Sequence, residues 1–152
     1  MYVYAMALEH YNIKASTSLM EFEFVSVGRK GKIKKVVQYS PTGIPEVYNL
    51  GFGDLDLETG NISDTSISDN GDSQKVLGTV SATVLKFVQK YPNSQVIAVG
   101  TSKSRTRLYQ IGISNNLDEI IKTFDIYGLK SEEWEPFERG HNYNAFLIRK
   151  KK

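Results

Sequence analysis

The segment SQKVLGTVSATVLKFVQKY, at residues 73–91, constrains the fold more than any other part of the 152-residue chain. Its apolar residues recur every three or four positions, which predicts an amphipathic helix. The residues with this spacing are Leu77, Val80, Val84, Phe87, Val88 and Tyr91. The middle of the segment consists of small and β-branched residues, which disfavour an isolated helix, so packing must supply its stability. We therefore expect the central core helix here, lying close against a sheet.

The chain before this helix predicts three antiparallel strands. Residues 19–28 alternate apolar and acidic side chains, the two-residue period of a half-buried strand. The turn GRKG leads into β-branched residues at 32–40, and the turn PTG at 41–43 leads into a third strand at 46–56. Residues 57–70 are polar and acidic, and a connection of this length usually runs over the surface.

The chain after the helix predicts a crossover. Residues 94–100 indicate a short buried strand. A second helix follows, with Thr101 or Ser102 as its N-cap and with Leu108 and Ile111 on its buried side. A helix followed by a tight turn and a strand of this length suggests a connection that packs on the first sheet.

Two further strands are expected at 125–130 and 143–150, with a loop at 131–142 between them. The order is then strand-strand-strand-helix-strand-helix-strand-strand. It predicts an α+β fold in which two main helices pack on a single mixed, mostly antiparallel sheet. We expect one domain over residues 19–152 and leave the structure of residues 1–18 open.

Composition excludes several kinds of site. The chain has no cysteine, which excludes disulfides, thiolate metal sites and thiol nucleophiles. Its two histidines, His10 and His141, lie far apart in sequence, and we predict no metal site. The formal charge of +2 is too small to indicate a nucleic-acid partner by itself. Because there is no signal-peptide pattern and no apolar run of roughly 20 residues, we expect a cytoplasmic protein without a membrane partner.

The start of the second helix is the first candidate site. Lys103, Arg105 and Arg107 lie at the end of a helix where unpaired amides already carry partial positive charge. An anion would make this field favourable, and Ser102 and Ser104 would add hydroxyl donors. Arg105 and Arg107 lie about 200° apart on a helix, so they cannot both face one ligand. The alternative is that acidic residues of the long connection pair with these bases.

The predicted hairpin is a second basic region, with Lys30, Lys32, Lys34 and Lys35 on its surface. Together with the basic C-terminal tail, it is a candidate surface for nucleic acid, whose binding would weaken steeply with salt. The same lysines are also an ordinary means of keeping an edge strand soluble.

Two other groups of residues have both a functional and a structural interpretation. Asp54, Asp56 and Glu58 point the same way along a strand, and they would either bind a divalent cation or pair with the lysines. Four aromatic residues near the C-terminus would either stack on single-stranded nucleic acid or close a small core. They are Trp134, Phe137, Tyr143 and Phe146. In both cases we favour the structural interpretation.

Nearly the whole chain from residue 22 onward resembles a bacterial family of unknown function. The resemblance lies in segments such as EFVSVGRKGKIKKVVQYSPT, SDNGDSQKVLGTVSATVLKFVQKYP and WEPFERGHNYNAFLI. It implies a bacterial cytoplasmic protein and carries no activity.

The order of elements also resembles the core of the GNAT acyltransferases, and RTRLYQIGI is similar to a pattern in their second helix. This resemblance implies coenzyme A as cofactor and Tyr109 as proton donor to its thiolate. It places pyrophosphate at the turn that contains Asn70 and Gly71, and a cleft between the strands at 45–55 and 94–100. Because the glycine-rich loop of that family is absent, we favour a GNAT-like scaffold that binds without catalysis.

We therefore predict a binding or interaction protein with an anion-accepting basic surface and no cofactor. Its partner would be an anionic ligand or a protein, and a role in a toxin–antitoxin or phage-defence module is compatible with this hypothesis. The alternative is an acyl-coenzyme A-dependent N-acyltransferase. A third hypothesis is a nucleic-acid-binding protein. The oligomeric state is left open.

Overall fold

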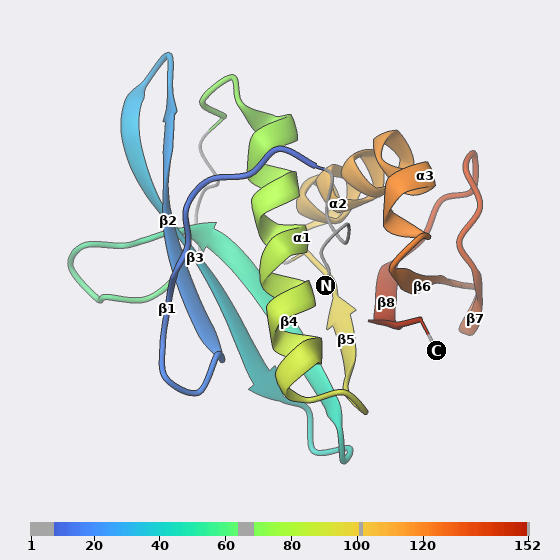
Figure 1. Cartoon of the computed structure of the whole chain (residues 1–152). Coiled ribbons are helices and arrows are strands. Elements are labelled where there is room, and N and C mark those ends of the chain that lie inside the picture. Colours follow the sequence, from blue (N-terminus) through green and yellow to red (C-terminus); the bar gives the residue numbers. More distant parts are fainter. Residues whose placement is uncertain (1–7, 64–68, 101, 152) are drawn as a thin grey trace.

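The computed structural model describes residues 8–63, 69–100 and 102–151 (Figure 1). The strands are β1 (Lys14–Ala15), β2 (Glu21–Gly28), β3 (Gly31–Pro41), β4 (Val47–Asp54), β5 (Gln95–Ala98), β6 (Phe124–Lys130), β7 (Glu133–Pro136) and β8 (Ala145–Lys150). The helices are α1 (Ser73–Lys90), α2 (Lys103–Asn115) and α3 (Leu117–Ile120).

The strands form one sheet in the order β1-β2-β3-β4-β5-β8-β6-β7. Every neighbouring pair is antiparallel except β4 and β5, which run parallel. This confirms the predicted α+β class, with one mixed, mostly antiparallel sheet and two main helices. The last strand, β8, lies between β5 and β6, so the C-terminal strand is an internal strand of the sheet and not an edge strand.

One strand lies where the sequence predicted only a loop. Residues 133–136 form β7, which pairs with β6 through a two-residue turn at Ser131 and Glu132. Both turn residues have positive φ, 52° and 65°. A turn with positive φ at both central residues suits a hairpin, but it usually contains glycine or asparagine. Neither residue type is present here, which is why the local sequence did not predict the hairpin.

α1 and α2 lie on the same face of the sheet. The hydrophobic core lies between these two helices and the sheet. The ring of Tyr39 in β3 stacks on Phe87 of α1, with centroids 4.2 Å apart. Further along the sheet, Leu50, Ala98 and Ile148 of β4, β5 and β8 line one small cavity together with side chains of α1 and α2. The predicted core positions of α1 are buried, apart from Leu77 and Tyr91, which are half-buried.

The buried side of α2 differs from the prediction. Leu108 and Ile111 are 48% and 43% exposed, whereas Tyr109 and Gly112 are buried. A Cβ on Gly112 would lie 2.4 Å from Cδ1 of Leu77 in α1. The two helices therefore meet where α2 has no side chain, and this close approach determines which face of α2 turns inward.

The N-terminal segment crosses the side of α1 that faces away from the sheet (Figure 1). The backbone amide of Tyr11 donates to Oγ1 of Thr79, 2.8 Å away. A Cβ on Gly78 would lie only 2.1 Å from the carbonyl oxygen of Glu9. Gly78 is therefore a crossing point, which explains a glycine in the middle of a helix.

Gly78→Ala tests this crossing. In an ordinary helix interior the change stabilises by about 1 kcal/mol. Here we expect a lower free energy of unfolding and faster hydrogen exchange at the Tyr11 amide, because the new methyl group displaces the N-terminal segment. Urea denaturation and amide exchange measure both effects, with Gln89→Ala at an exposed position of α1 as the control. A stabilised Gly78→Ala protein with a protected Tyr11 amide would contradict the proposed crossing.

Candidate functional site

The sheet opens where β4 and β5 diverge. β5 pairs with β4 only from Val47 to Leu50 and ends at Ala98, whereas β4 continues to Asp54. A pocket of about 210 Å³, here called the α1–α2 pocket, lies at this divergence. Its lining residues are Lys35, Phe52, Asp69, Asn70, Asp72, Ser73, Gln74, Val76, Leu77, Arg105, Leu108, Tyr109, Ile111 and Asn115. Eight of these fourteen residues are polar or charged and six are apolar or aromatic, although most of the pocket's surface is apolar.

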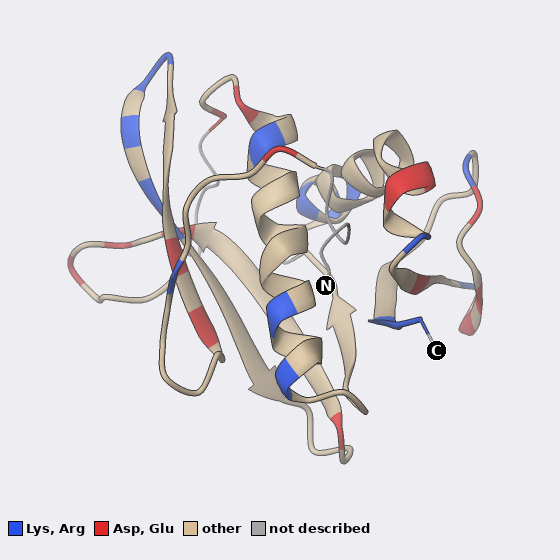
Figure 2. Cartoon of the chain, viewed as in Figure 1, with Lys and Arg blue, Asp and Glu red and all other residues tan. Residues whose placement is uncertain are grey.

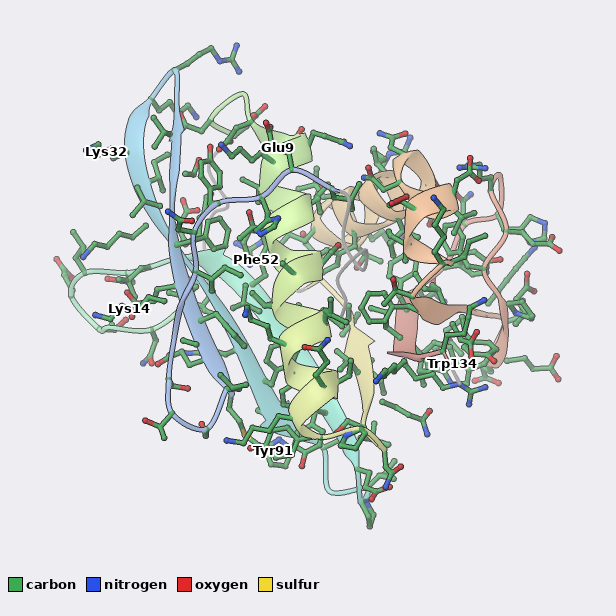
Figure 3. All side chains as sticks on the ribbon, viewed as in Figure 1. Glu9, Lys14, Lys32, Phe52, Tyr91 and Trp134 are labelled. Carbon is green, nitrogen blue, oxygen red and sulfur yellow. The ribbon has the colours of Figure 1, made fainter. Side chains whose placement is uncertain are left out.

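The edge of β4 beyond the β5 pairing lies at this pocket. The carbonyls of Glu46 and Asp54 accept from Gln95 and Ser63, at 2.8 Å and 2.7 Å. Because backbone groups point alternately to the two sides of a strand, the even-numbered residues of this stretch face away from β3. Phe52 is the first such residue beyond the β5 pairing. Its amide and carbonyl therefore point into the divergence, and its ring lies between the sheet and α1 (Figure 3).

Lys35 and Asp54 form a buried ion pair at the base of the pocket. They are cross-strand neighbours in β3 and β4, and 1% and 8% of their surfaces are exposed. The prediction that Lys35 belongs to the basic surface is wrong, because adjacent residues of a strand point to opposite faces and only Lys34 faces solvent. Asp54 does pair with a lysine as predicted, but in the interior rather than at a solvated strand end.

The other hairpin lysines, Lys30, Lys32 and Lys34, are exposed. Figure 2 shows basic residues along the tip and outer edge of the β2–β3 hairpin, and Figure 3 shows Lys32 pointing away from the molecule. The predicted basic surface therefore keeps three of its four members.

Tyr109 of α2 lines the pocket with 8% of its surface exposed. Burial raises the pKa of its phenol to about 12, against an opposing effect of the nearby Arg105 guanidinium. At neutral pH the phenol is therefore protonated, and it can donate a proton rather than accept one. No hydrogen bond joins its hydroxyl to another of the described residues, and the oxygen itself is not fully buried.

The structure separates the residues predicted to bind an anion at α2. Arg105 is half-buried and lines the pocket, whereas Arg107, two positions on, is exposed and does not. Ser102 is the N-cap, and its Oγ accepts from the amide of Arg105 at 3.3 Å. Ser104 is exposed. Thr101, the other predicted cap, lies outside the described residues.

Asp72, the residue before α1, links three segments of the chain. Asp72 occupies the N-cap position of α1, but its side chain does not cap the helix. Instead its carboxylate accepts from the hydroxyls of Tyr11 and Ser26, at 2.5 Å and 2.6 Å. This network joins the N-terminal segment, β2 and the start of α1. Ser73 and Gln74, the first residues of α1, line the pocket.

Asn70 is buried and its side chain is fully engaged. Its Oδ1 accepts from the amide of Lys30 at 2.6 Å, and its Nδ2 donates to the Ser26 hydroxyl and the Gly31 carbonyl at 3.1 Å and 2.9 Å. Asn70 therefore fixes the hairpin to the start of α1. Gly71, which the resemblance placed with Asn70 at a pyrophosphate site, is exposed and has a φ of 79°.

A profile of DUF6934 matches residues 7–151. The chain belongs to DUF6934, a family of unknown function. No curated protein and no solved structure matches the chain, and the resemblance to the GNAT acyltransferases stays a prediction.

Two further findings concern this DUF6934 chain. In the part that the structure describes, no helix has both the length and the apolar character needed to cross a bilayer. Of the four aromatic residues near the C-terminus, Phe137, Tyr143 and Phe146 are buried and contact one another, which confirms their predicted core role. Trp134 is 41% exposed.

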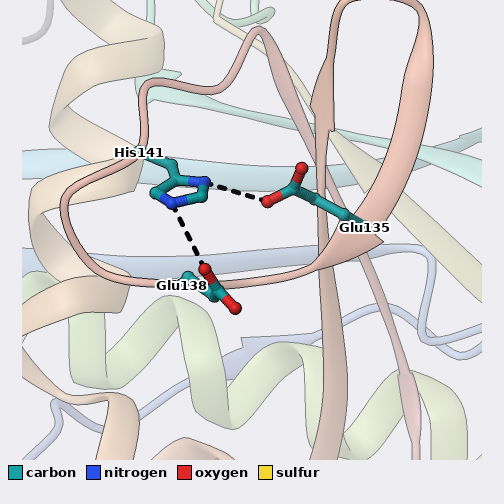
Figure 4. Close-up of side chains that lie close together, drawn as sticks. All are labelled: Glu135, Glu138 and His141. Carbon is teal, nitrogen blue, oxygen red and sulfur yellow. Dashed lines mark hydrogen bonds and ion pairs between the residues drawn. The ribbon is translucent and has the colours of Figure 1, made fainter.

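Sequence reasoning missed one cluster in the DUF6934 chain. His141 lies between Glu135 and Glu138, with its two ring nitrogens 3.0 Å and 3.2 Å from their carboxylate oxygens (Figure 4). Hydrogen bonds from the Tyr143 hydroxyl and from His141 hold the pKa of Glu135 below its ordinary value. The spacing E-x-x-E-x-x-H was the available signal. It lacks the helical pattern of known metal motifs, so it was not singled out.

Proposed function

We propose that this DUF6934 protein binds a small ligand in the α1–α2 pocket, one that joins an anionic group to an apolar part. The observation that carries the proposal is the divergence of β4 and β5, which opens a pocket with a mostly apolar surface and with polar lining residues that include Arg105. Small-molecule sites commonly combine apolar surface with polar groups that fix the ligand's orientation. The partly exposed Tyr109 hydroxyl adds a donor without a partner in the described part of the chain.

The anionic group of the ligand would lie between Arg105 and the first turn of α1. A helix N-terminus presents unpaired amides to an anion. Ser73 and Gln74 line the pocket, and α1 has no acidic residue in its first turn. The nearby Asp72 carboxylate already accepts hydrogen bonds from the Tyr11 and Ser26 hydroxyls. Arg105 would add a charge-assisted hydrogen bond.

The second candidate is acyl transfer from acyl-coenzyme A on a GNAT-like scaffold. One specific observation favours it: β5 pairs with β4 only as far as Leu50, so no strand of the described residues pairs with this edge of β4 at Phe52, and an amide-bearing ligand chain could continue the sheet there. An acceptor amine would attack the thioester carbonyl, forming an amide and releasing the coenzyme A thiolate. Tyr109, protonated at neutral pH, would donate its proton to that thiolate, and the proton that the amine nitrogen loses would return through solvent to the Tyr109 phenolate.

Calorimetry with acetyl-coenzyme A, adenosine diphosphate and inorganic phosphate tests the binding proposal. We expect acetyl-coenzyme A to bind, and Arg105→Gln to weaken binding by about tenfold or more, as expected for the loss of a hydrogen bond to a charged group. Arg107→Gln is the matched control, because it removes the same charge from an exposed position of the same helix. Equal weakening by both changes, or no heat from any probe at about 1 mM, would contradict the pocket as the site.

Acyl transfer is tested separately by following thiol release from acetyl-coenzyme A with a panel of amines. The chain has no cysteine, so a thiol reagent gives no signal from the protein itself. If the second candidate is correct, Tyr109→Phe should keep acetyl-coenzyme A binding and lower the rate by about 100-fold, within the range of a general acid. Binding without thiol release from any amine would leave the binding proposal standing and remove the transferase.

A further inference from the structure

We propose that Glu135, Glu138 and His141 form a binding site for a divalent transition-metal ion of the Zn²⁺ type. Glu135 lies in β7, and Glu138 and His141 lie on the loop that follows it; none of the three lines the α1–α2 pocket. Each offers one ligand atom, and these atoms all lie within 4.8 Å of one another. Zinc binds nitrogen and carboxylate oxygen at about 2.0–2.2 Å, so ligands around one ion lie about 3–4 Å apart. Small movements of the half-buried His141 and the exposed Glu138 would bring Nε2 and a Glu138 oxygen onto one ion, with Glu135 beside them to hold the imidazole.

The surroundings of the two His141 ring nitrogens point to a bound cation. Nδ1 lies 3.0 Å from the Glu135 carboxylate and Nε2 lies 3.2 Å from the Glu138 carboxylate (Figure 4). A neutral imidazole carries a single N–H, so one of its nitrogens would face a carboxylate with lone pairs on both sides. A positive charge between the imidazole and Glu138 removes this conflict. With neutral His141, the two carboxylates also leave the cluster at a charge of −2, which attracts a divalent ion.

Glu135 is the carboxylate that orients the imidazole. It accepts from the Tyr143 hydroxyl at 2.8 Å, and Tyr143 is buried, with its ring directly over Gly128. A histidine that binds a metal through one nitrogen usually donates its other N–H to a carboxylate. Nδ1–H of His141 can make that bond to Glu135. Nε2 is then free for the ion, together with Glu138, whose side chain is 64% exposed.

The backbone of this loop is fixed to α2. Gln110 donates through Nε2 to the carbonyl of His141 and accepts through Oε1 from the amide of Tyr143, 3.0 Å away. Arg139 donates through Nε to the carbonyl of Ser114 at 2.9 Å. The ligands therefore project from a segment held at several points, which lowers the entropy lost when they close on an ion.

The ligand set selects among ions. One imidazole nitrogen and carboxylate oxygens suit Zn²⁺, Co²⁺ or Ni²⁺, whereas Ca²⁺ and Mg²⁺ prefer oxygen ligands alone. The absence of cysteine from the chain removes thiolates as competing ligands for these metals. We therefore expect Zn²⁺ to bind and Ca²⁺ to leave the cluster unchanged.

The experiment uses the full chain and its two histidines. Zn²⁺ is titrated while the imidazole carbon–proton signals of His10 and His141 are followed by NMR, and calorimetry gives the stoichiometry. We expect one ion per chain, with shifts at His141 and none at His10. Glu138→Gln and His141→Gln should each weaken Zn²⁺ binding by about 10–100-fold. His10→Gln, which changes the other, exposed histidine, should leave binding as it is.

Several results would overturn the proposal. One is Zn²⁺ that shifts His10 as much as His141, which would indicate weak binding to any exposed imidazole. Another is a His141 signal that is imidazolium at pH 7 and does not respond to about 1 mM Zn²⁺, because the cation in the cluster would then be a proton. The wild-type NMR titration gives this answer without any variant, so a variant that fails to fold does not weaken the test.

Discussion

Lys35→Met is expected to lower the free energy of unfolding by about 3–5 kcal/mol. The change removes the ammonium group that pairs with Asp54 at the base of the α1–α2 pocket. Lys35 is 1% exposed and Asp54 is 8% exposed, so the remaining carboxylate would be left in the interior without its partner charge. Urea denaturation followed by circular dichroism measures the loss.

Two further variants make this prediction specific. Lys34→Met changes the adjacent, exposed lysine of β3 and should alter the free energy of unfolding by no more than about 0.5 kcal/mol. The double change Lys35→Met with Asp54→Leu replaces both charges by apolar groups and should recover most of the loss, as other buried pairs do. If Lys35→Met costs no more than Lys34→Met, then the pair is not buried in the protein in solution.

The second large effect is expected at Asn70. Asn70→Ala should lower the free energy of unfolding by about 3 kcal/mol, because three side-chain hydrogen bonds of about 1 kcal/mol each are lost. Since these bonds fix the hairpin turn to the start of α1, hydrogen exchange at the Lys30 amide should also become faster. Denaturation and amide exchange measure the two consequences.

Asn12→Ala, at an exposed asparagine, is the matched control and should change stability little. Asn70→Asp separates the contribution of the acceptor from that of the donors. It keeps an acceptor for the Lys30 amide and loses both hydrogen bonds that the side-chain amide nitrogen donates. We therefore expect it to lie between wild type and Asn70→Ala in stability. Wild-type stability with a protected Lys30 amide in Asn70→Ala would show that the hairpin is held by other contacts.

The elements that sequence predicted well are those whose signal is local. Phe22 and Phe24 alternate with glutamates in β2, and both are buried, because successive residues of a strand face opposite sides. α1 follows its three-to-four spacing for the same kind of reason. β7 was not predicted because Ser131 and Glu132 have positive φ, although neither is a glycine or an asparagine, the residues that usually indicate such a turn.

The candidate site was only partly predictable. Arg105 was singled out from the charge at a helix N-terminus, and the structure places it in a pocket. Its separation from Arg107 follows from helix geometry, which the sequence contains. Lys35 was misplaced, although the two-residue period already required Lys34 and Lys35 to face opposite sides. That the β4–β5 pairing ends before Phe52 could not be predicted, because it depends on where the separate strand β5 ends.

The amino-acid pattern by itself determined the class of this protein: alternation and helical spacing are properties of neighbouring residues, so they appear in any fold that the chain adopts. Tertiary structure alone decided the face of α2 that turns inward, because a methyl group at Gly112 has no room beside Leu77. It also decided which polar residues enter the interior. Packing distances between distant segments set these choices, and no local pattern records them.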